Sequence, residues 1–140
     1  MSVQKTTIVV RLMLEREEQI LFLKKTIQNG GGYSLVGGKL DFGESASEAI
    51  IRESHEEANI IIKRKHLRLV HILKREFEQE LVLLYYAKKW KGNLESMETE
   101  KFKTVEWISK HELPTDISQV TKNLLDAYFE KHFFREWLKE

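Results

Sequence analysis

Six of the seven glycines of the chain fall within residues 30–43, and a helix signal follows them directly. So many glycines in a short stretch indicate backbone conformations that other residues avoid, or a close approach to a ligand. Ser45 and Glu48 then form an S-x-x-E capping box, and residues 46–58 contain neither Gly nor Pro. Asn59 stands where a helix ends in the left-handed conformation, which Asn tolerates. The sequence therefore predicts a glycine-rich loop that runs into a helix over residues 46–58.

Apolar and β-branched segments on either side of this helix predict the rest of the fold. We expect a β-hairpin over residues 6–14 and 19–25, a short strand over 33–36, a second hairpin over 67–74 and 81–88, a strand over 103–108, and a C-terminal helix from about 116 to 138 after Pro114. The order β-β-β-α-β-β-β-α is typical of a mixed sheet between helices, an α/β or α+β layered domain. Because no repeat or linker interrupts residues 1–140, we expect a single domain.

The overall composition excludes several function classes. The chain has no cysteine, which excludes thiol catalysis and Cys-ligated zinc and suits a reducing compartment. Its formal net charge of +1 gives no electrostatic case for a stable nucleic-acid partner or for an anionic membrane. The N-terminal residues lack the apolar core of a signal peptide, and no apolar stretch approaches the ~20 residues that span a bilayer. We therefore expect a soluble, cytoplasmic protein.

The predicted helix concentrates acidic residues. Residues 44–59 contain five glutamates and one arginine, so this segment carries −4 and the remaining chain +5. On a helical wheel Glu53, Glu56 and Glu57 fall within an arc of about 100° that continues the apolar stripe of the first turns. Like charges at these spacings cost about 0.2–0.5 kcal/mol each. Carboxylates at the rim of a core are costly unless a cation neutralises them.

Two interpretations of this acidic stripe are open, a solvated face and a metal site. We favour the metal site, because the acids lie in line with the apolar stripe and no lysine is interleaved with them. Oxygen ligands alone select a hard ion, Mg²⁺ above all, with Mn²⁺ as an acceptable substitute.

Residues 38–60 resemble the Nudix box, G-x5-E-x7-R-E-U-x-E-E-x-G-U, in which U is a bulky apolar residue. The chain reads GKLDFGE, then seven residues, then RESHEEANI, and the spacing matches throughout. Ser54 replaces the apolar residue, which suggests altered packing behind the helix, and Asn59 replaces the glycine. Every charged position is present. The later Glu100, Trp107 and E-L-P at 112–114 resemble the closing strand of the same family. The resemblance implies the Nudix fold, a mixed β-sheet between helices, over essentially the whole chain.

The resemblance also implies an activity and a metal site. MutT-like Nudix hydrolases cleave a nucleoside diphosphate linked to another group, with water as the nucleophile. By similarity Glu56, Glu57 and the backbone carbonyl of Gly38 would hold the metal ions. Glu53 would be a further ligand or the general base, a choice that stays open. Glu53 and Glu57 are therefore the first candidates for catalytic residues.

Supporting roles follow from the same resemblance. Arg52 would orient a carboxylate, Glu53 or Glu44, through its bidentate fork. Glu44 would stabilise the loop beside the Ser45 cap. Glu100 is the candidate ligand from outside the helix, with Glu98 as its competitor.

The substrate is expected to be a nucleotide. The closing segment is most similar to the branch that converts a nucleoside triphosphate into a monophosphate and pyrophosphate. Arg11 and Lys24, with the neighbouring Lys25, are candidates for phosphate contacts, and Tyr33 is the first candidate for stacking on a base. Phe77 and Tyr85 are further aromatic candidates.

Two alternatives remain beside this function. The enzyme could cleave another diphosphate, such as ADP-ribose or a dinucleoside polyphosphate; RNA decapping is disfavoured, because it usually needs additional basic surface or a further domain. A non-catalytic nucleotide-binding Nudix module is the other alternative, and loss of one of the three helix glutamates would be its signature.

The C-terminal segment is rich in aromatic residues. Five of the fourteen aromatics lie in it: Tyr128, Phe129, Phe133, Phe134 and Trp137. The expected C-terminal helix would pack them on the sheet. Because the apolar residues wrap more than one helical face, a homodimer interface is the alternative.

Overall fold

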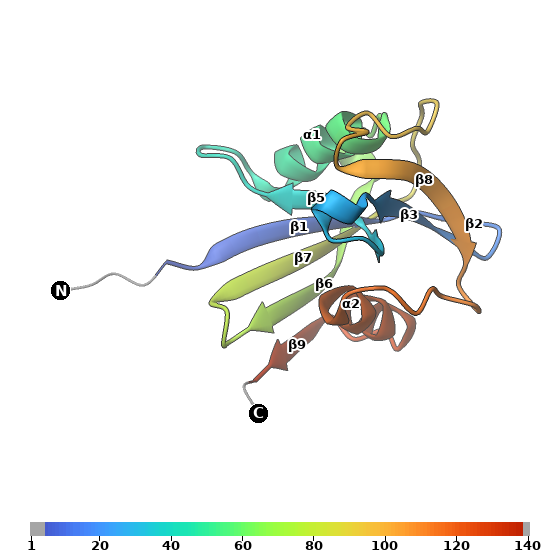
Figure 1. The fold of residues 1–140 in the computed structure, drawn as a ribbon. Helices are drawn as coiled ribbons and strands as arrows, with labels where there is room; N and C mark the ends of the chain where they lie inside the picture. The colour runs from blue at the N-terminus through green and yellow to red at the C-terminus, as the bar shows by residue number, and fades with distance from the viewer. Residues whose placement is uncertain (1–4, 139–140) are drawn as a thin grey trace.

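A five-stranded mixed sheet forms the centre of the computed structural model, which describes residues 5–138 (Figure 1). Its strands lie in the order β5 (Val36–Lys39), β1 (Thr7–Met13), β7 (Glu80–Ala87), β6 (Leu67–Arg75) and β9 (Phe134–Trp137). The expected second hairpin is confirmed as the antiparallel β6–β7 pair. Two pairs are parallel, β1 with β7 and β6 with β9, and the sequence pattern did not predict either.

A second sheet is built around β3 (Gln19–Lys25). This strand pairs with β2 (Glu15–Arg16), β4 (Tyr33–Ser34) and β8 (Phe102–Ser109), each antiparallel. The expected hairpin of residues 6–14 with 19–25 forms only near its turn, where Glu15–Arg16 pairs with β3 and Leu21 N–H donates to the Leu14 carbonyl at 3.1 Å; residues 7–13 pair with other strands. The reason is the two-sided burial of β1, in which Val9, Val10 and Met13 are all buried. Because both faces of this strand are covered, its backbone groups are cut off from water, and pairing with β5 and β7 satisfies them on both edges.

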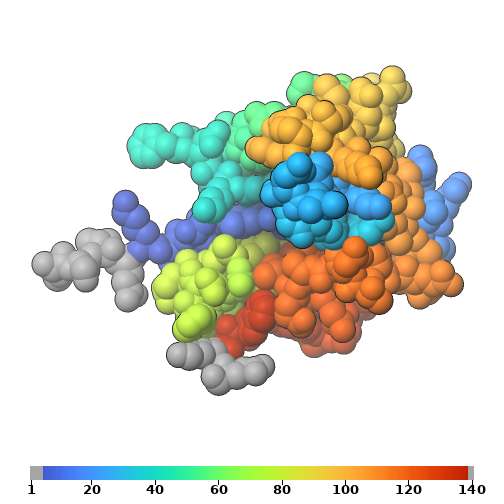
Figure 2. All heavy atoms as spheres, in the orientation of Figure 1, coloured from blue at the N-terminus to red at the C-terminus, as the bar shows by residue number. Residues whose placement is uncertain are grey.

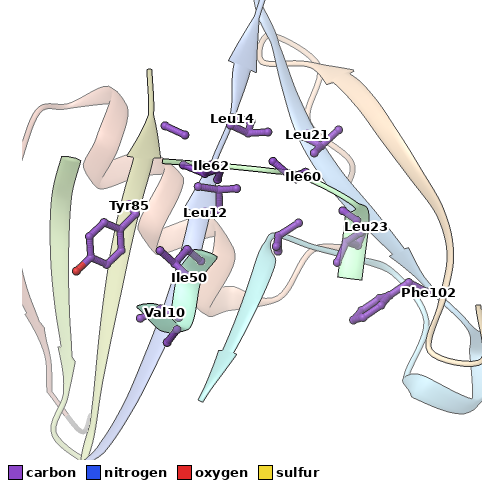
Figure 3. Packing of buried hydrophobic residues seen from close by; sticks show 14 residues of the cluster. Val10, Leu12, Leu14, Leu21, Leu23, Ile50, Ile60, Ile62, Tyr85 and Phe102 are labelled. Atoms are coloured by element: carbon purple, nitrogen blue, oxygen red, sulfur yellow. The ribbon is translucent and has the colours of Figure 1, made fainter. Parts of the chain in front are cut away.

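The two helices cover opposite faces of the five-stranded sheet, and each closes its own hydrophobic core. The α1 helix (Ala46–Ala58) packs against β5 and β1, and Ile50 joins a core with Val10 and Leu12 (Figure 3). The α2 helix (Gln119–Phe129) packs against β6, and its Leu124 and Leu125 join the core on the other face. The expected architecture, a mixed sheet between helices, is therefore confirmed, with the second sheet as an addition.

The C-terminal helix is shorter than expected. It ends at Phe129, where the chain turns through Lys131 with a φ of +60°, and residues 134–137 form β9 instead of continuing the helix. The edge of β6 decides this outcome, because its free backbone groups pair in parallel with residues 134–137. Phe133 and Phe134 are consequently exposed, whereas Trp137 packs against the core.

No helix within residues 5–138 is long and apolar enough to cross a membrane.

Candidate active site

The α1 helix begins and ends as its sequence predicts. The Ser45 hydroxyl accepts a hydrogen bond of 3.1 Å from the backbone N–H of Glu48, whose carboxylate accepts one of 3.2 Å from Ser45 N–H. Asn59 closes the helix in the left-handed conformation, with φ of 57°. Ser54 is fully buried, and its hydroxyl donates a 2.6 Å hydrogen bond to the Ile50 carbonyl. A polar residue is therefore accommodated at this apolar position without an unsatisfied group.

Arg52 of α1 is the centre of a network of ion pairs with the acidic side chains of the helix and of the loop before it. Its guanidinium donates two hydrogen bonds to the Glu44 carboxylate, of 2.7 and 3.0 Å, and single bonds to Glu53 at 2.9 Å and to Glu56 at 3.1 Å. Asp41, which the sequence did not single out, lies 3.4 Å from the Arg52 Nε. The Glu44 hydrogen bonds are the main reason why the pKa of Arg52 lies above its usual range, and Arg52 in turn lowers the pKa of Glu44. The expected pairing of Arg52 with Glu44 and Glu53 is thus present.

Glu44 also shapes the loop before the helix. Its carboxylate accepts a 2.9 Å hydrogen bond from the backbone N–H of Asp41, and the Arg52 guanidinium donates to the Lys39 carbonyl at 3.3 Å. The loop before α1 is therefore tied to the Arg52 side chain directly at Lys39 and through Glu44 at Asp41.

Glu57 is the buried acid of the site. It is only 6% exposed, and its carboxylate accepts a 2.9 Å hydrogen bond from the backbone N–H of Gly37. Burial raises the pKa of Glu57 to about 8; the Gly37 hydrogen bond and the Arg11 charge lower it, whereas the neighbouring Glu53 and Glu98 charges raise it further. An isolated carboxylate at this place is therefore held neutral up to mildly alkaline pH unless a cation approaches it.

Gly37 and Gly38 allow strand β5 to pass close to two neighbours. A Cβ on Gly37, whose φ is +151°, would lie 1.9 Å from the Val10 carbonyl oxygen. A Cβ on Gly38 would lie 2.8 Å from the Glu53 Oε1. The predicted close approach of the glycine-rich stretch is thus an approach to β1 and to the acidic helix face.

The structure separates the two candidates for an acid from outside the helix. Glu98 lies in the loop that reaches the C-terminal end of α1, where Met97 N–H donates to the Glu57 carbonyl at 3.0 Å, and the Glu98 charge acts on Glu57. The Glu100 side chain is exposed, and its backbone carbonyl accepts a hydrogen bond from the Thr26 hydroxyl. The position of Glu98 therefore suits a site ligand better than that of Glu100.

A cleft of about 580 Å³ opens beside Glu57, Gly37 and Gly38. Five basic side chains are among the residues that line it: Arg11, Lys25, Lys39, Arg75 and Lys101. Figure 2 shows part of its rim, where η1 (Ile27–Asn29, bright blue) lies between the amber loop before β8 and the orange segment before α2. The Asn29 side chain donates to the Lys101 carbonyl at 3.1 Å, which ties η1 to that loop.

Not every expected substrate residue faces this cleft. Arg11 lines it, and burial lowers the pKa of its guanidinium while the Glu57 and Glu53 charges raise it. Lys24 and Tyr33 are not among its lining residues: the Lys24 ammonium lies 5.8 Å from the Tyr33 ring centre, and the Tyr33 hydroxyl donates to Glu106. Because side chains alternate along a strand, Lys25 rather than Lys24 points into the cleft. Lys39 and Lys101 carried no distinguishing sequence signal.

The remaining aromatic candidates lie elsewhere. Tyr85 belongs to the core beneath α1, and Phe77 is exposed in the turn between β6 and β7.

The oxygen groups around Glu57 fit a hard divalent cation. The buried carboxylate with its raised pKa favours a neighbouring positive charge, and Glu53 places its oxygens against the side-chain-free Gly38. Within residues 5–138 no three acidic or histidine side chains are grouped as metal ligands, and Glu53 and Glu56 both accept hydrogen bonds from Arg52.

Comparison with known proteins agrees with this geometry. Residues 4–128 match the family model described as the NUDIX domain. Among curated proteins, the NAD-capped RNA hydrolase NudC of Photorhabdus laumondii is 28% identical over 101 residues, which cover 72% of this chain and 38% of the relative. The NudC of Pseudomonas entomophila is 25% identical over 119 residues, covering 84% and 42%. The chain thus spans about two fifths of the length of these relatives.

Solved structures share the fold at lower identity. A MutT NUDIX hydrolase from Burkholderia pseudomallei superposes with a TM-score of 0.77 at 22% identity, covering 88% of this chain and 98% of the other. A NUDIX hydrolase from Nitrosomonas europaea superposes with a TM-score of 0.78 at 22% identity, covering 96% and 79%. With the family model matching most of its length and its acids gathered where the box predicts, the chain belongs to the Nudix hydrolase family.

Proposed function

We propose that this protein hydrolyses a diphosphate linkage in a nucleotide, with Mg²⁺, or Mn²⁺ in its place, and water as the nucleophile. One observation carries the proposal: the buried Glu57 lies beside Glu53 and Gly38 at the wall of a cleft lined by basic side chains. A solvated acidic face would not bury its central carboxylate. The geometry therefore favours the metal site over the solvated face.

The residues divide into ligands and positioning groups. Glu53, Glu56, Glu57 and the Gly38 carbonyl would hold the ion, and Glu98 is the candidate from the loop. When bound, Mg²⁺ would neutralise phosphate charge and lower the pKa of a water molecule. Glu53 stays open as a ligand or as the base that accepts the proton of the attacking water. Arg52 orients Glu53 and Glu56 through its hydrogen bonds.

The cleft supports a polyphosphate as the substrate. Its volume of about 580 Å³ is in the range that holds a nucleotide, and Lys25, Lys39 and Lys101 bring positive charge to it. We propose a nucleoside triphosphate, which would leave as a monophosphate and pyrophosphate. The homodimer and the cytoplasmic location stay predictions.

A second candidate substrate comes from the curated relatives. Proteins named NAD-capped RNA hydrolases match 72–84% of this chain, so an NAD-like dinucleotide joined to RNA competes with the triphosphate. In both substrates the bond broken is a phosphoric anhydride, and the same acids would serve.

A substrate panel with metal control tests the function. Nucleoside triphosphates, ADP-ribose, a dinucleoside polyphosphate, NAD⁺ and NAD-capped RNA are each assayed with Mg²⁺, with Mn²⁺ and with excess EDTA. We expect turnover only with metal, and the highest kcat/KM for a triphosphate. Full turnover in EDTA would exclude the metal mechanism, and a higher kcat/KM for another member of the panel would replace the proposed substrate.

Two substitutions connect the activity to the acids. Glu53→Gln and Glu57→Gln should each lower kcat by about 10²–10⁴-fold, while His55→Gln, at an exposed position of the same helix, should not. Unchanged turnover in both glutamate variants would return the helix to the solvated interpretation. Binding of nucleotide without turnover anywhere in the panel would indicate the non-catalytic module.

A further inference from the structure

A second cleft, of about 400 Å³, lies beyond the other end of β7 from the candidate active site. Its lining residues are Ile61, Lys63, His66, Lys88, Lys89, Trp90 and Lys91. Glu80 and Val82 near the start of β7 line the active-site cleft, whereas Lys88 directly follows the end of the strand. At the rise of a β-strand, Val82 and Lys88 lie about 20 Å apart along β7. We call the second one the basic cleft.

The two segments that form the basic cleft carry a large excess of positive charge. Residues 60–68 and 87–92 contain seven lysines and arginines and no acid, so they carry +7, while the whole chain carries +1 and the remainder −6. Within the described residues no acidic side chain forms an ion pair with any of the four lining lysines. The net charge of the whole chain is therefore small although this part of the surface is strongly basic.

The backbone holds these cations on a fixed frame. Lys88 N–H donates to the His66 carbonyl at 2.9 Å, and Ile61 and Lys91 exchange two backbone hydrogen bonds, both of 2.9 Å. The segment before β6 and the segment after β7, which meet at the open end of the β6–β7 hairpin, thus form the two sides of the cleft. Burial, and then the surrounding lysines, lower the pKa of His66, so this imidazole stays neutral among the ammonium groups.

An aromatic side chain lies among the lysines. Trp90 lines the cleft and packs on Trp107 with ring centres 5.9 Å apart, and the Arg16 guanidinium lies 4.3 Å from the centre of the Trp107 ring. The Trp90 ring is therefore supported from behind and half-buried. Cations around a supported aromatic ring match the alternation of phosphates and bases in a nucleic-acid strand.

We propose that the basic cleft binds a single strand of nucleic acid, with its phosphates on the lysines and a base on Trp90. A lone phosphate would need only one or two of the four lysines. A membrane surface would favour basic residues on a convex or flat face rather than around a hollow. An acidic peptide would match the charge but would leave the aromatic ring unused. The basic cleft shares no lining residue with the active-site cleft, so binding and hydrolysis can be measured separately, and the proposal does not rest on the proposed function.

Binding of a fluorescein-labelled single-stranded RNA of 12 nucleotides, followed by anisotropy, tests the proposal. The test variant is Lys63→Glu with Lys89→Glu, and the matched control is Lys103→Glu with Lys122→Glu, two exposed lysines outside the cleft. Both variants change the net charge equally. We expect at least a tenfold weaker affinity in the test variant and less than a twofold change in the control. The slope of log Kd against log salt should also fall by about 1.4 in the test variant, for two lost phosphate contacts.

Trp90→Leu separates base stacking from charge. We expect it to weaken RNA binding about tenfold, the effect of losing one stacked base, and to leave the affinity for a polyglutamate peptide unchanged. A thermal melt shows whether Trp90→Leu still folds. If it does not, the comparison of the two lysine double variants tests the proposal instead. Equal weakening in both lysine pairs would overturn the proposal. So would tighter binding to the polyglutamate peptide or to phosphatidylserine vesicles than to the RNA.

Discussion

The buried carboxylate of Glu57 accepts a hydrogen bond of 2.9 Å from the backbone N–H of Gly37. The bond joins the last turn of α1 to the strand that carries the glycine pair, so it sets the distance between the acidic face and Gly38. It favours the ionised carboxylate, but burial outweighs it and raises the pKa of Glu57 to about 8. Without a cation, Glu57 is therefore a source of instability at neutral and alkaline pH.

We expect the metal-free protein to lose stability as the pH rises from about 5 to about 8. The folded-state pKa of Glu57 lies above its unfolded value of 4.5, so the folded state binds the proton more tightly. The contribution of Glu57 to the free energy of unfolding is full below the unfolded pKa and is lost as the pH rises through the folded pKa. At about 1.4 kcal/mol per pKa unit, this loss amounts to up to a few kcal/mol. Thermal melts in EDTA across this range measure it.

Glu57→Gln is the matched variant for this titration. It keeps the acceptor for Gly37 N–H but cannot ionise, so its Tm should vary less with pH than that of the wild type. Parallel Tm curves for the two proteins would contradict the assigned pKa.

Substitution by alanine should affect mainly activity at Gly38 and mainly stability at Gly37. In Gly38→Ala the new Cβ meets the far end of the flexible Glu53 side chain, which can move, so we expect little change in Tm but a marked fall in kcat. In Gly37→Ala the new Cβ meets the Val10 carbonyl at 1.9 Å, and the backbone cannot yield cheaply. We expect a loss of about 3 kcal/mol or more in the free energy of unfolding. Urea unfolding and turnover separate the two effects.

Gly43→Ala supplies the control for backbone strain alone. Gly43 has a φ of +80° and open space around its Cβ direction, so alanine should cost about 1–2 kcal/mol without affecting the acids. If Gly38→Ala leaves kcat at the level of Gly43→Ala, the contact between Gly38 and Glu53 has no functional role.

The sequence predicted best those parts of the fold that local signals determine. The capping box at Ser45 and the left-handed Asn59 bound α1 at the expected residues. Residues 134–137 form a strand because β6 has a free edge, and nothing local in a run of aromatic residues indicates that edge. The parallel neighbours of β1 likewise depend on tertiary pairing.

The candidate site shows the same division. The helix period brings Glu53, Glu56 and Glu57 to one stripe, and the box spacing places Arg52 beside them. The cleft-facing side of β3 depends on its register, so the sequence offered both Lys24 and Lys25 as phosphate contacts, whereas only Lys25 lines the cleft. The choice between Glu98 and Glu100 depends on the path of a loop, which no period describes.

We expect Glu98→Gln to lower activity more than Glu100→Gln, the reverse of the order that the sequence suggested. The Glu98 charge acts on Glu57, and the segment around it is fixed by the bond from Met97 N–H to the Glu57 carbonyl. Glu100 contributes its backbone carbonyl, which a Gln substitution leaves in place. Titration of kcat with Mg²⁺ for both variants decides the matter. A larger loss in Glu100→Gln would restore that residue as the outside ligand.

Arg52→Lys should keep the charge of the network and lose its geometry. The Arg52 guanidinium donates two hydrogen bonds to Glu44 and one each to Glu53 and Glu56. A lysine ammonium cannot make all four bonds in that arrangement. We expect a loss of about 10–100-fold in kcat or in Mg²⁺ affinity, as for other groups that orient ligands. The loss of stability should be about 1 kcal/mol, because Arg52 is partly exposed.

Arg135→Lys is the control for this substitution, since Arg135 pairs with Glu130 on the surface, outside the lining of the active-site cleft. It should leave turnover and its Mg²⁺ dependence unchanged. A purely structural role for Arg52 would lower Tm without moving the Mg²⁺ concentration at half-maximal rate, whereas a positioning role moves that concentration. An Arg52→Lys enzyme with wild-type kcat and wild-type Mg²⁺ dependence would show that the carboxylates reach their working positions without the arginine.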